Sequence, residues 1–251
     1  MQVTCVTNRG LARARNEDSC YAVSSGTKAL LVVADGMGGH RAGNVASAIV
    51  VAEAEKSWME ISKEDPDSDA SSRNIINKLI GTANQQILDK ARTDPSLQGM
   101  GTTVTAGLLC DQSLTIGHVG DSRAYQVSDS SIILLTKDHS LVEKLIETGQ
   151  VKAEEACSHP QRHILTRALG IEAEIEIDIT TRQIKEESIL ILCTDGLTNM
   201  VRDHEILAIV ESNINNDPRH TAEALVAMAN ERGGYDNITV VVAKGIGGRQ
   251  N

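Results

Sequence analysis

Two apolar runs in this chain each end in an aspartate followed by a glycine. Residues 30–39 read LLVVADGMGG and residues 189–198 read ILILCTDGLT, so Asp35 and Asp195 come directly after the runs. Apolar runs of this length without alternation are typical of strands buried on both faces. An Asp–Gly pair most often forms a turn, so either site taken alone is explained by a turn. The alternative is that both strands deliver a carboxylate to one place, and periodicity does not decide between the two.

Composition limits the classes of protein to which the chain can belong. It is long enough, at 251 residues, to bury one hydrophobic core, and no linker or repeat divides it, so we expect one domain over residues 1–251. An aromatic content of 2% and a net charge of −10 disfavour base stacking and phosphate-backbone binding, so no nucleic acid partner is expected.

Targeting signals are also missing from the sequence. No window approaches the roughly 18 consecutive apolar residues of a membrane span, and no basic region followed by an apolar stretch opens the chain. The five cysteines form no Cys-x-x-Cys pair, which fits reduced thiols. We therefore expect a cytoplasmic protein without membrane contact.

The order of the expected elements favours an α+β fold. Two short strands lie within residues 1–34, a helix runs from Ala42 to about Ile61, and a second helix begins at Ser71 or Ser72. Strand-like runs between 101 and 136 precede a short helix over 140–149, and residues 151–170 lack a steady period. Strands over 171–180 and 188–194, helices over about 203–213 and 219–232, and a strand over 237–245 follow. Because strands and helices come in blocks rather than in strict alternation, a parallel doubly wound sheet is not expected.

Further acidic residues lie beside the apolar strands, namely Glu17, Asp18, Asp121 and Asp236. Each is explained separately by a solvated loop or a turn, but carboxylates gathered in one place would need protons or cations to neutralise them. Oxygen ligands favour Mg²⁺, Mn²⁺ or Ca²⁺ over Zn²⁺. A zinc site at His159 and His163 is not expected, because Pro160 lies between them and interrupts a helix.

Eight motifs follow one another along the chain: RARNED, VVADGMGGHRAG, GTTVTAGLL, HVGDSRAY, TKDHS, LTRALG, CTDGLTNM and DNITVVV. This ordered set closely resembles the metal-dependent serine/threonine protein phosphatases of the type 2C class, particularly their compact bacterial members, over about residues 1–244. The resemblance implies a four-layer α-β-β-α sandwich, in which two antiparallel sheets are flanked by helix pairs. It also implies a mobile flap at about residues 151–170 that influences the choice of protein substrate.

The resemblance further implies a role for each matched residue. Asp35 would bridge two metal ions, Glu17 and the Gly36 carbonyl would join one of them, and Asp195 and Asp236 would join the other. Asp18 would support the ligands from behind, Asp121 with Asp195 would hold a third, weaker ion, and Arg13 would bind the phosphate. From the residues alone, Arg13 is also explained as a surface charge, and Asp121 as a turn carboxylate that pairs with Arg123.

One position departs from part of the family. Some relatives have a histidine directly after the first Asp–Gly, and this chain has Met37 there. His40 follows the glycines instead, and it is either a proton donor to the leaving alcohol or an exposed loop residue.

The function implied is hydrolysis of phosphoserine and phosphothreonine in proteins by a metal-bridging hydroxide, with two tight Mn²⁺ or Mg²⁺ ions and a third weaker one. The substrates would be phosphoproteins made by a serine/threonine kinase, and the enzyme would be a monomer. A different class of function is a catalytically silent phosphoprotein-binding regulatory module on the same fold. A third is a metal-dependent hydrolase of small phosphoesters, which the carboxylates alone do not exclude.

Overall fold

Two five-stranded antiparallel sheets form the centre of the molecule in the computed structural model, which describes residues 1–38, 42–62, 68–152, 154–155 and 159–246. The first sheet has the order β1 (Gln2–Asn8), β12 (Ile238–Lys244), β11 (Ile189–Cys193), β8 (Arg123–Ser128) and β9 (Ser131–Leu134). The second has the order β10 (Asp178–Gln183), β7 (Ser113–Val119), β6 (Val104–Cys110), β3 (Lys28–Ala34) and β2 (Ser19–Ser25). All of these neighbouring strands pair antiparallel.

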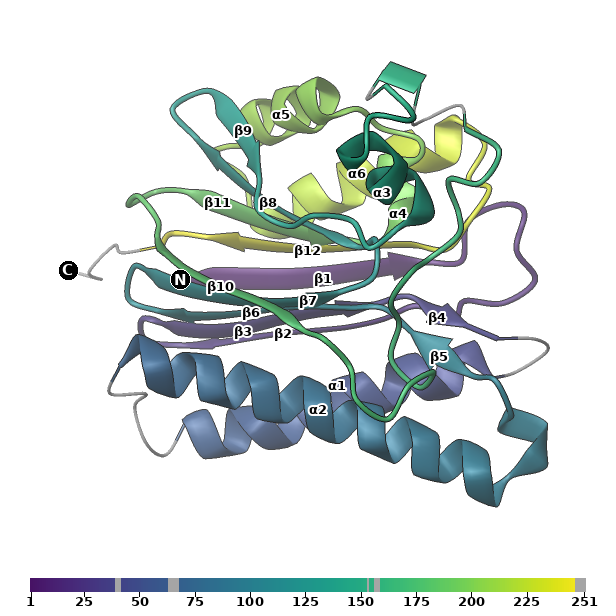
Figure 1. Ribbon diagram of the computed structural model, residues 1–251. Helices are drawn as coiled ribbons and strands as arrows, with labels where there is room; N and C mark the ends of the chain where they lie inside the picture. The colour runs from purple at the N-terminus through teal and green to yellow at the C-terminus, as the bar shows by residue number, and fades with distance from the viewer. Residues whose placement is uncertain (39–41, 63–67, 153, 156–158, 247–251) are drawn as a thin grey trace.

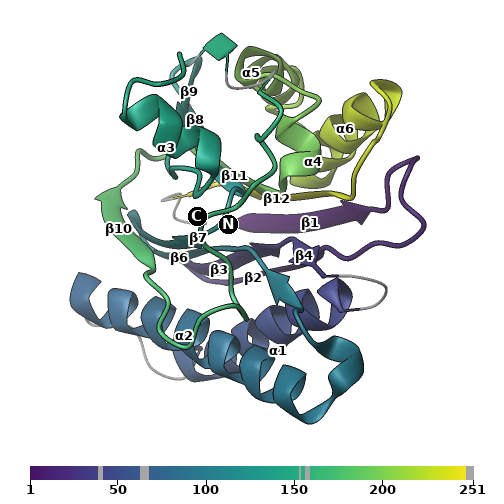
Figure 2. The same cartoon turned by 45° about the vertical axis from the view of Figure 1, so that its right-hand side comes forward.

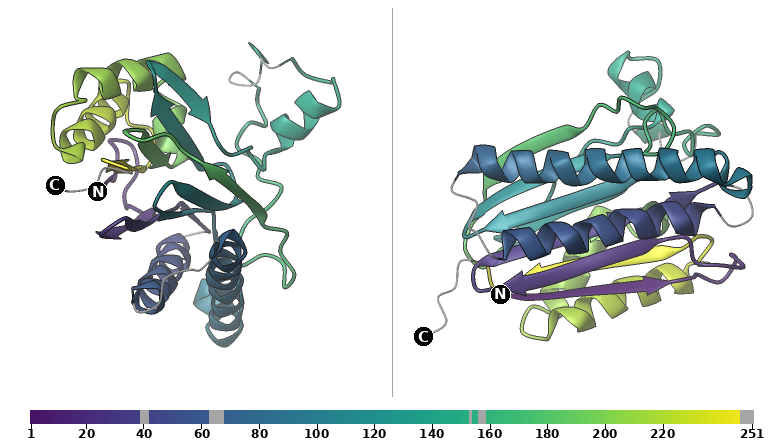
Figure 3. Two further views of the ribbon diagram at one scale, coloured as in Figure 1. Left: turned by 90° about the vertical axis from the view of Figure 1, so that its left-hand side faces the viewer. Right: turned by 90° about the horizontal axis from the view of Figure 1, so that it is seen from below.

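Helix pairs cover the outer faces of the two sheets (Figure 1). The long helices α1 (Gly43–Ile61) and α2 (Asp69–Thr93) lie side by side on the second sheet, and α5 (Asp203–Ser212) and α6 (Pro218–Glu231) cover the first (Figure 3). The predicted α+β sandwich of four layers is therefore confirmed. Short elements complete the chain: α3 (Leu141–Glu147), α4 (Asp195–Thr198), a 3-10 turn (Pro95–Leu97), β4 (Gly36–Met37) and β5 (Gly101–Thr102).

Strand β3 explains the continuous apolar run of the sequence. Leu31 and Val33 point between the sheets, where they join Leu190 and Leu192 of β11 in one buried cluster. Leu30 and Val32 point the other way, into the cluster under α1 and α2. Because both faces are covered, no polar position interrupts the strand before Asp35.

The expected strand over residues 171–180 is wrong over most of its length. Its alternating pattern is typical of a strand, but pairing with β7 begins only at Asp178, opposite His118. The preceding residues pass beside α2, where the Asn84 side chain donates to the Glu172 and Ala173 carbonyls at 2.9 and 3.4 Å. Figure 2 shows this segment descending to the α2 layer before it turns back into β10.

The flap region is better anchored than its lack of period predicts. Its second half contacts the core, because Leu169 is fully buried and exchanges two backbone hydrogen bonds with Thr102. The lack of a steady period therefore does not mean that this half is without core contacts. Over the part of the chain that the structure describes, no helix is long and apolar enough to cross a membrane.

Candidate active site

The site lies at one end of the sandwich, where β4, β5 and α4 gather on the right of Figure 1. Asp35 follows β3 there, and two threonines fix its backbone. The Asp35 N–H donates to Thr103 Oγ1 at 3.0 Å, and the Asp35 carbonyl accepts from Thr103 N at 2.9 Å and Thr102 Oγ1 at 2.8 Å. The carboxylate is thus presented from a rigid strand end rather than from a turn.

The glycine after each aspartate permits a close approach of two backbones. A Cβ on Gly36 would lie 2.2 Å from the Gly43 carbonyl oxygen, and one on Gly196 would lie 1.9 Å from the Asn237 carbonyl oxygen. Asp35 runs on into β4, and Asp195 begins α4. The turn explanation of these two Asp–Gly pairs is therefore wrong.

Six aspartates line a single cleft of about 620 Å³ together with Arg13, and four of them are acids singled out in the sequence. These four are Asp35, Asp121, Asp195 and Asp236. Burial, followed by repulsion from its acidic neighbours, raises the pKa of Asp35 well above its ordinary value. Burial and Asp195 do the same to Asp121, and burial and Asp236 raise the pKa of Asp195. This mutual repulsion is what a divalent cation relieves.

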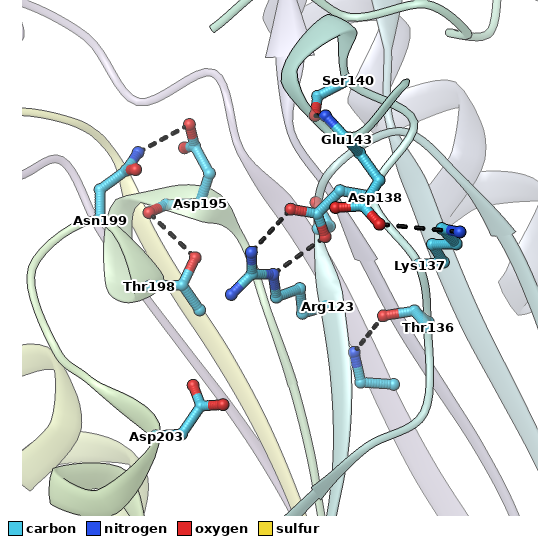
Figure 4. Close-up of polar contacts among 12 residues, drawn as sticks. Arg123, Thr136, Lys137, Asp138, Ser140, Glu143, Asp195, Thr198, Asn199 and Asp203 are labelled. Carbon is cyan, nitrogen blue, oxygen red and sulfur yellow. Dashed lines mark hydrogen bonds and ion pairs between the residues drawn. The ribbon is translucent and has the colours of Figure 1, made fainter. Parts of the chain in front are cut away.

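Asp195 lies at the start of α4 and has one free oxygen. Its Oδ2 accepts from Asn199 Nδ2 at 3.0 Å, as Figure 4 shows, whereas Oδ1 is buried without a hydrogen-bond partner. A buried acceptor of this kind is costly unless another donor or a cation reaches it.

Asp121 does not pair with Arg123, contrary to the simpler reading of that position. Arg123 instead binds Asp138 at two points, with Nε–Oδ1 and Nη2–Oδ2 distances of 2.9 and 2.7 Å (Figure 4). Asp121 lines the cleft, where burial and the charge of Asp195 raise its pKa.

Glu17 and Gly36 meet on the other side of Asp35. An ideal Cβ on Gly43 would lie 2.6 Å from Glu17 Oε2 and 2.7 Å from the Gly36 carbonyl oxygen, so both oxygens surround one point. Only a glycine leaves this space open. The arrangement brings together two of the oxygen ligands expected from the sequence.

Asp18 is buried behind the cleft. Its Oδ2 accepts from Thr239 Oγ1 at 2.7 Å and Thr194 Oγ1 at 2.9 Å, and its Oδ1 has no hydrogen-bond partner. Burial raises the pKa of Asp18 to about 7, although the two hydroxyl groups oppose this shift. Thr194 comes directly before Asp195, so Asp18 supports the segment that carries this aspartate.

Arg13 lies at the rim of the cleft. Its Nη2 forms an ion pair with Asp236 Oδ2 at 2.7 Å, and more than half of the side chain is exposed. The charges of Asp35 and Asp195 also favour the guanidinium. The arginine is therefore oriented by the acidic cluster while part of it still faces solvent.

Asn237 is a site residue that sequence reasoning missed. Its side chain accepts from Glu17 N and donates to the Arg9 and Arg15 carbonyls, each at 2.8 Å. It thus fixes the loop that carries Arg13 and Glu17 beside Asp236. Its only signal in the sequence is its place in the DNITVVV motif. By itself that motif predicts a turn followed by a strand, and not a contact with the loop that carries Arg13 and Glu17.

The donor set fits hard divalent cations, because it consists of carboxylate and carbonyl oxygens. Among the described residues, no three acidic, histidine or cysteine side chains already converge on one metal position. The carboxylates line the cleft without converging on one point, so holding an ion between them requires side-chain movement. His40 lies outside the described residues.

Comparisons with known proteins agree with this geometry. The model of the protein phosphatase 2C family matches residues 11–228. The serine/threonine phosphatase stp of Listeria welshimeri is 38% identical over 243 residues, which cover 95% of this chain and 93% of that protein. The solved serine/threonine phosphatase PstP/Ppp of Mycobacterium tuberculosis has a TM-score of 0.87 at 38% identity and covers 97% of both chains.

A second solved structure contains metal. It is the catalytic domain of the serine/threonine protein phosphatase PstP in complex with two manganese ions, with a TM-score of 0.83, 36% identity and 97% coverage of both chains. The resemblance found in the sequence is confirmed by family match, sequence identity and fold. The chain belongs to the protein phosphatase 2C family.

Proposed function

We propose that this chain is a metal-dependent phosphatase that hydrolyses phosphoserine and phosphothreonine in proteins. The observation that carries the proposal is the gathering of four aspartates and an exposed arginine in one cleft. The names of its relatives, which are serine/threonine phosphatases, and the manganese complex of one of them support the same activity.

The residues divide into two groups around Asp35, which would contact both tight ions. Asp195 and Asp236 would complete one ion site, and Glu17 with the Gly36 carbonyl the other. Asp121 would hold a third, weaker ion with Asp195. Bound Mn²⁺ or Mg²⁺ would supply a water nucleophile of lowered pKa and offset the negative charge of the phosphate.

The chain itself contributes position and charge. Arg13 offers a planar fork of donors that suits the oxygens of a phosphoryl group better than lysine would. Thr102 and Thr103 fix Asp35, and Asn237 fixes the Arg13 loop, so little reorganisation is needed when the substrate binds. We also propose His40 as the group that protonates the leaving alcohol.

A silent binding module on the same fold is the second candidate, and the retained acids argue against it. Every aspartate and glutamate matched to a metal ligand is present. We further propose that residues 1–251 act as one domain, as a cytoplasmic monomer opposed to a serine/threonine kinase. The absence of any Cys-x-x-Cys pair in the sequence fits a reducing compartment.

The test is an assay of purified protein after chelation, with Mn²⁺ or Mg²⁺ added back. A phosphothreonine peptide is compared with ATP and a sugar phosphate. We expect no turnover without metal, and peptide turnover well above that of the small phosphoesters when metal is restored. Asp35→Asn should abolish this recovery, whereas Asp129→Asn, at an exposed aspartate on the far β8–β9 turn, should retain it. Full peptide turnover in excess chelator would refute the metal-dependent mechanism.

A further inference from the structure

Two large apolar side chains stand exposed beside the cleft. The chain has only four aromatic residues, and Tyr125 and Trp58 are buried while Tyr21 is partly buried. The fourth, Tyr235, is 65% exposed. Leu11 is 67% exposed, and these two are the most exposed large apolar side chains among the described residues. We name the pair the Leu11–Tyr235 shelf.

The shelf is held in place although it faces solvent. A Cβ on Gly233 would lie 2.7 Å from two ring atoms of Tyr235, so the ring lies against this glycine. Leu11 lies in the same way on Gly234, at 3.1 Å from such a Cβ to its Cγ. The Leu11 N–H donates to the Gly234 carbonyl at 2.7 Å. The two side chains therefore lie on neighbouring glycines, and a backbone hydrogen bond fixes the segment that carries Leu11.

The shelf continues directly into the proposed phosphate site. Leu11 lies two residues before Arg13, and Tyr235 comes directly before Asp236. The ion pair between Arg13 and Asp236 joins the two segments at 2.7 Å. An extended peptide rises about 3.4 Å per residue, so a phosphorylated residue at Arg13 places its near neighbours within reach of the shelf.

We propose that the Leu11–Tyr235 shelf binds an apolar side chain of the phosphoprotein substrate, one to three positions from the phosphorylated residue. This inference rests on the proposed function and adds a substrate preference to it. Rigid aromatic and aliphatic groups beside a charged anchor are the usual high-energy contacts of a binding surface. The phosphate supplies the charged anchor, and the apolar neighbour supplies the contact that distinguishes one phosphoprotein from another.

The experiment compares two sets of phosphothreonine peptides that differ only in leucine or serine at each position within three residues of the phosphothreonine. The measured quantity is the ratio of kcat/KM for the best leucine peptide to that of its serine partner. We expect a ratio of at least about tenfold for the wild-type protein, the effect of burying roughly one leucine side chain. Tyr235→Ala and Leu11→Ala should bring the ratio close to one, and Tyr235→Leu should retain most of it.

Met59→Ala is the matched control, since Met59 is 56% exposed on the distant helix α1. It should retain the wild-type ratio. Because each ratio is internal to one variant, a general loss of activity near Asp236 does not change it. A wild-type ratio near one, or an unchanged ratio in both shelf variants, would overturn the proposal. So would a wild-type dimer in sedimentation that Tyr235→Ala converts to a monomer, because the shelf would then bind a second copy. Turnover of the serine peptides tests the proposed function separately.

Discussion

Replacing Asn237 with alanine should loosen the loop that carries Arg13 and Glu17. The side chain is 6% exposed and makes three hydrogen bonds of 2.8 Å, to Glu17 N and to the Arg9 and Arg15 carbonyls. Each bond contributes about 1 kcal/mol net, so the loss totals about 3 kcal/mol, or about two orders of magnitude in the equilibrium between closed and open loop.

Two measurements check this prediction. Thermal unfolding should shift by about 6–12 °C if the loop opens only with the whole chain, and by less if it opens locally. Activity on a phosphothreonine peptide should require up to about 100-fold more Mn²⁺ for its half-maximal rate, because Glu17 is no longer held beside Gly36.

Asn84→Ala provides a control of equal chemistry. Asn84 is 2% exposed and also makes three hydrogen bonds to a loop, to Gly170 N and to the Glu172 and Ala173 carbonyls. It should lose similar stability and keep the wild-type Mn²⁺ requirement. If both variants lose stability and neither changes the Mn²⁺ requirement, Asn237 holds the fold together but does not prepare the site.

Four other outcomes are expected. Asp35→Ala or Asp195→Ala should lower kcat by several orders of magnitude at saturating Mn²⁺, and near-normal rates in both would refute their role as ligands. Arg13→Ala should lose roughly 1.5–3 kcal/mol of phosphate binding, or about one to two orders of magnitude in kcat/KM, in steady-state kinetics. Asp121→Asn should keep the fold and the two tighter ions in calorimetry, yet raise the metal concentration needed for half-maximal rate. Burial raises the pKa of Asp18 in the folded chain to about 7, above its ordinary value. The metal-free fold therefore loses stability as the pH rises through that value and Asp18 loses its proton. The gain in Tm on adding Mn²⁺ should therefore increase from about pH 5.5 to about pH 8.

Much of the fold could be predicted from local pattern, and the exceptions have physical causes. The apolar strands and the long helices were visible because their periods are clear. Strand β2 was not, since SCYAVSS combines small polar and apolar residues at a sheet edge. Helix α2 begins at Asp69, capped by Ser68, earlier than either serine expected from the pattern. The pattern over 171–177 resembled a strand because it alternates, but Ile175 and Ile177 pack on the helix layer instead.

The convergence of the acids follows from strand register, which composition and periodicity do not contain. β3 and β6 pair antiparallel with Val33 opposite Thr105, so Asp35 at the end of one strand meets Thr103 at the start of the other. β7 also ends beside the start of β6, with Val119 opposite Val104, and this brings Asp121 to the same corner.

The first sheet repeats this arrangement. Cys193 of β11 lies opposite Val240 of β12, so Asp195 follows one strand where Asp236 precedes its neighbour. An antiparallel pair necessarily places the end of one strand at the start of the next. Three of the acids follow β3, β7 and β11, and one precedes β12. They therefore gather at one end of the sandwich, because the two sheets are stacked with these strand ends together. The Asp–Gly pairs mark the strand ends in the sequence, and the stacking of the sheets makes them one site.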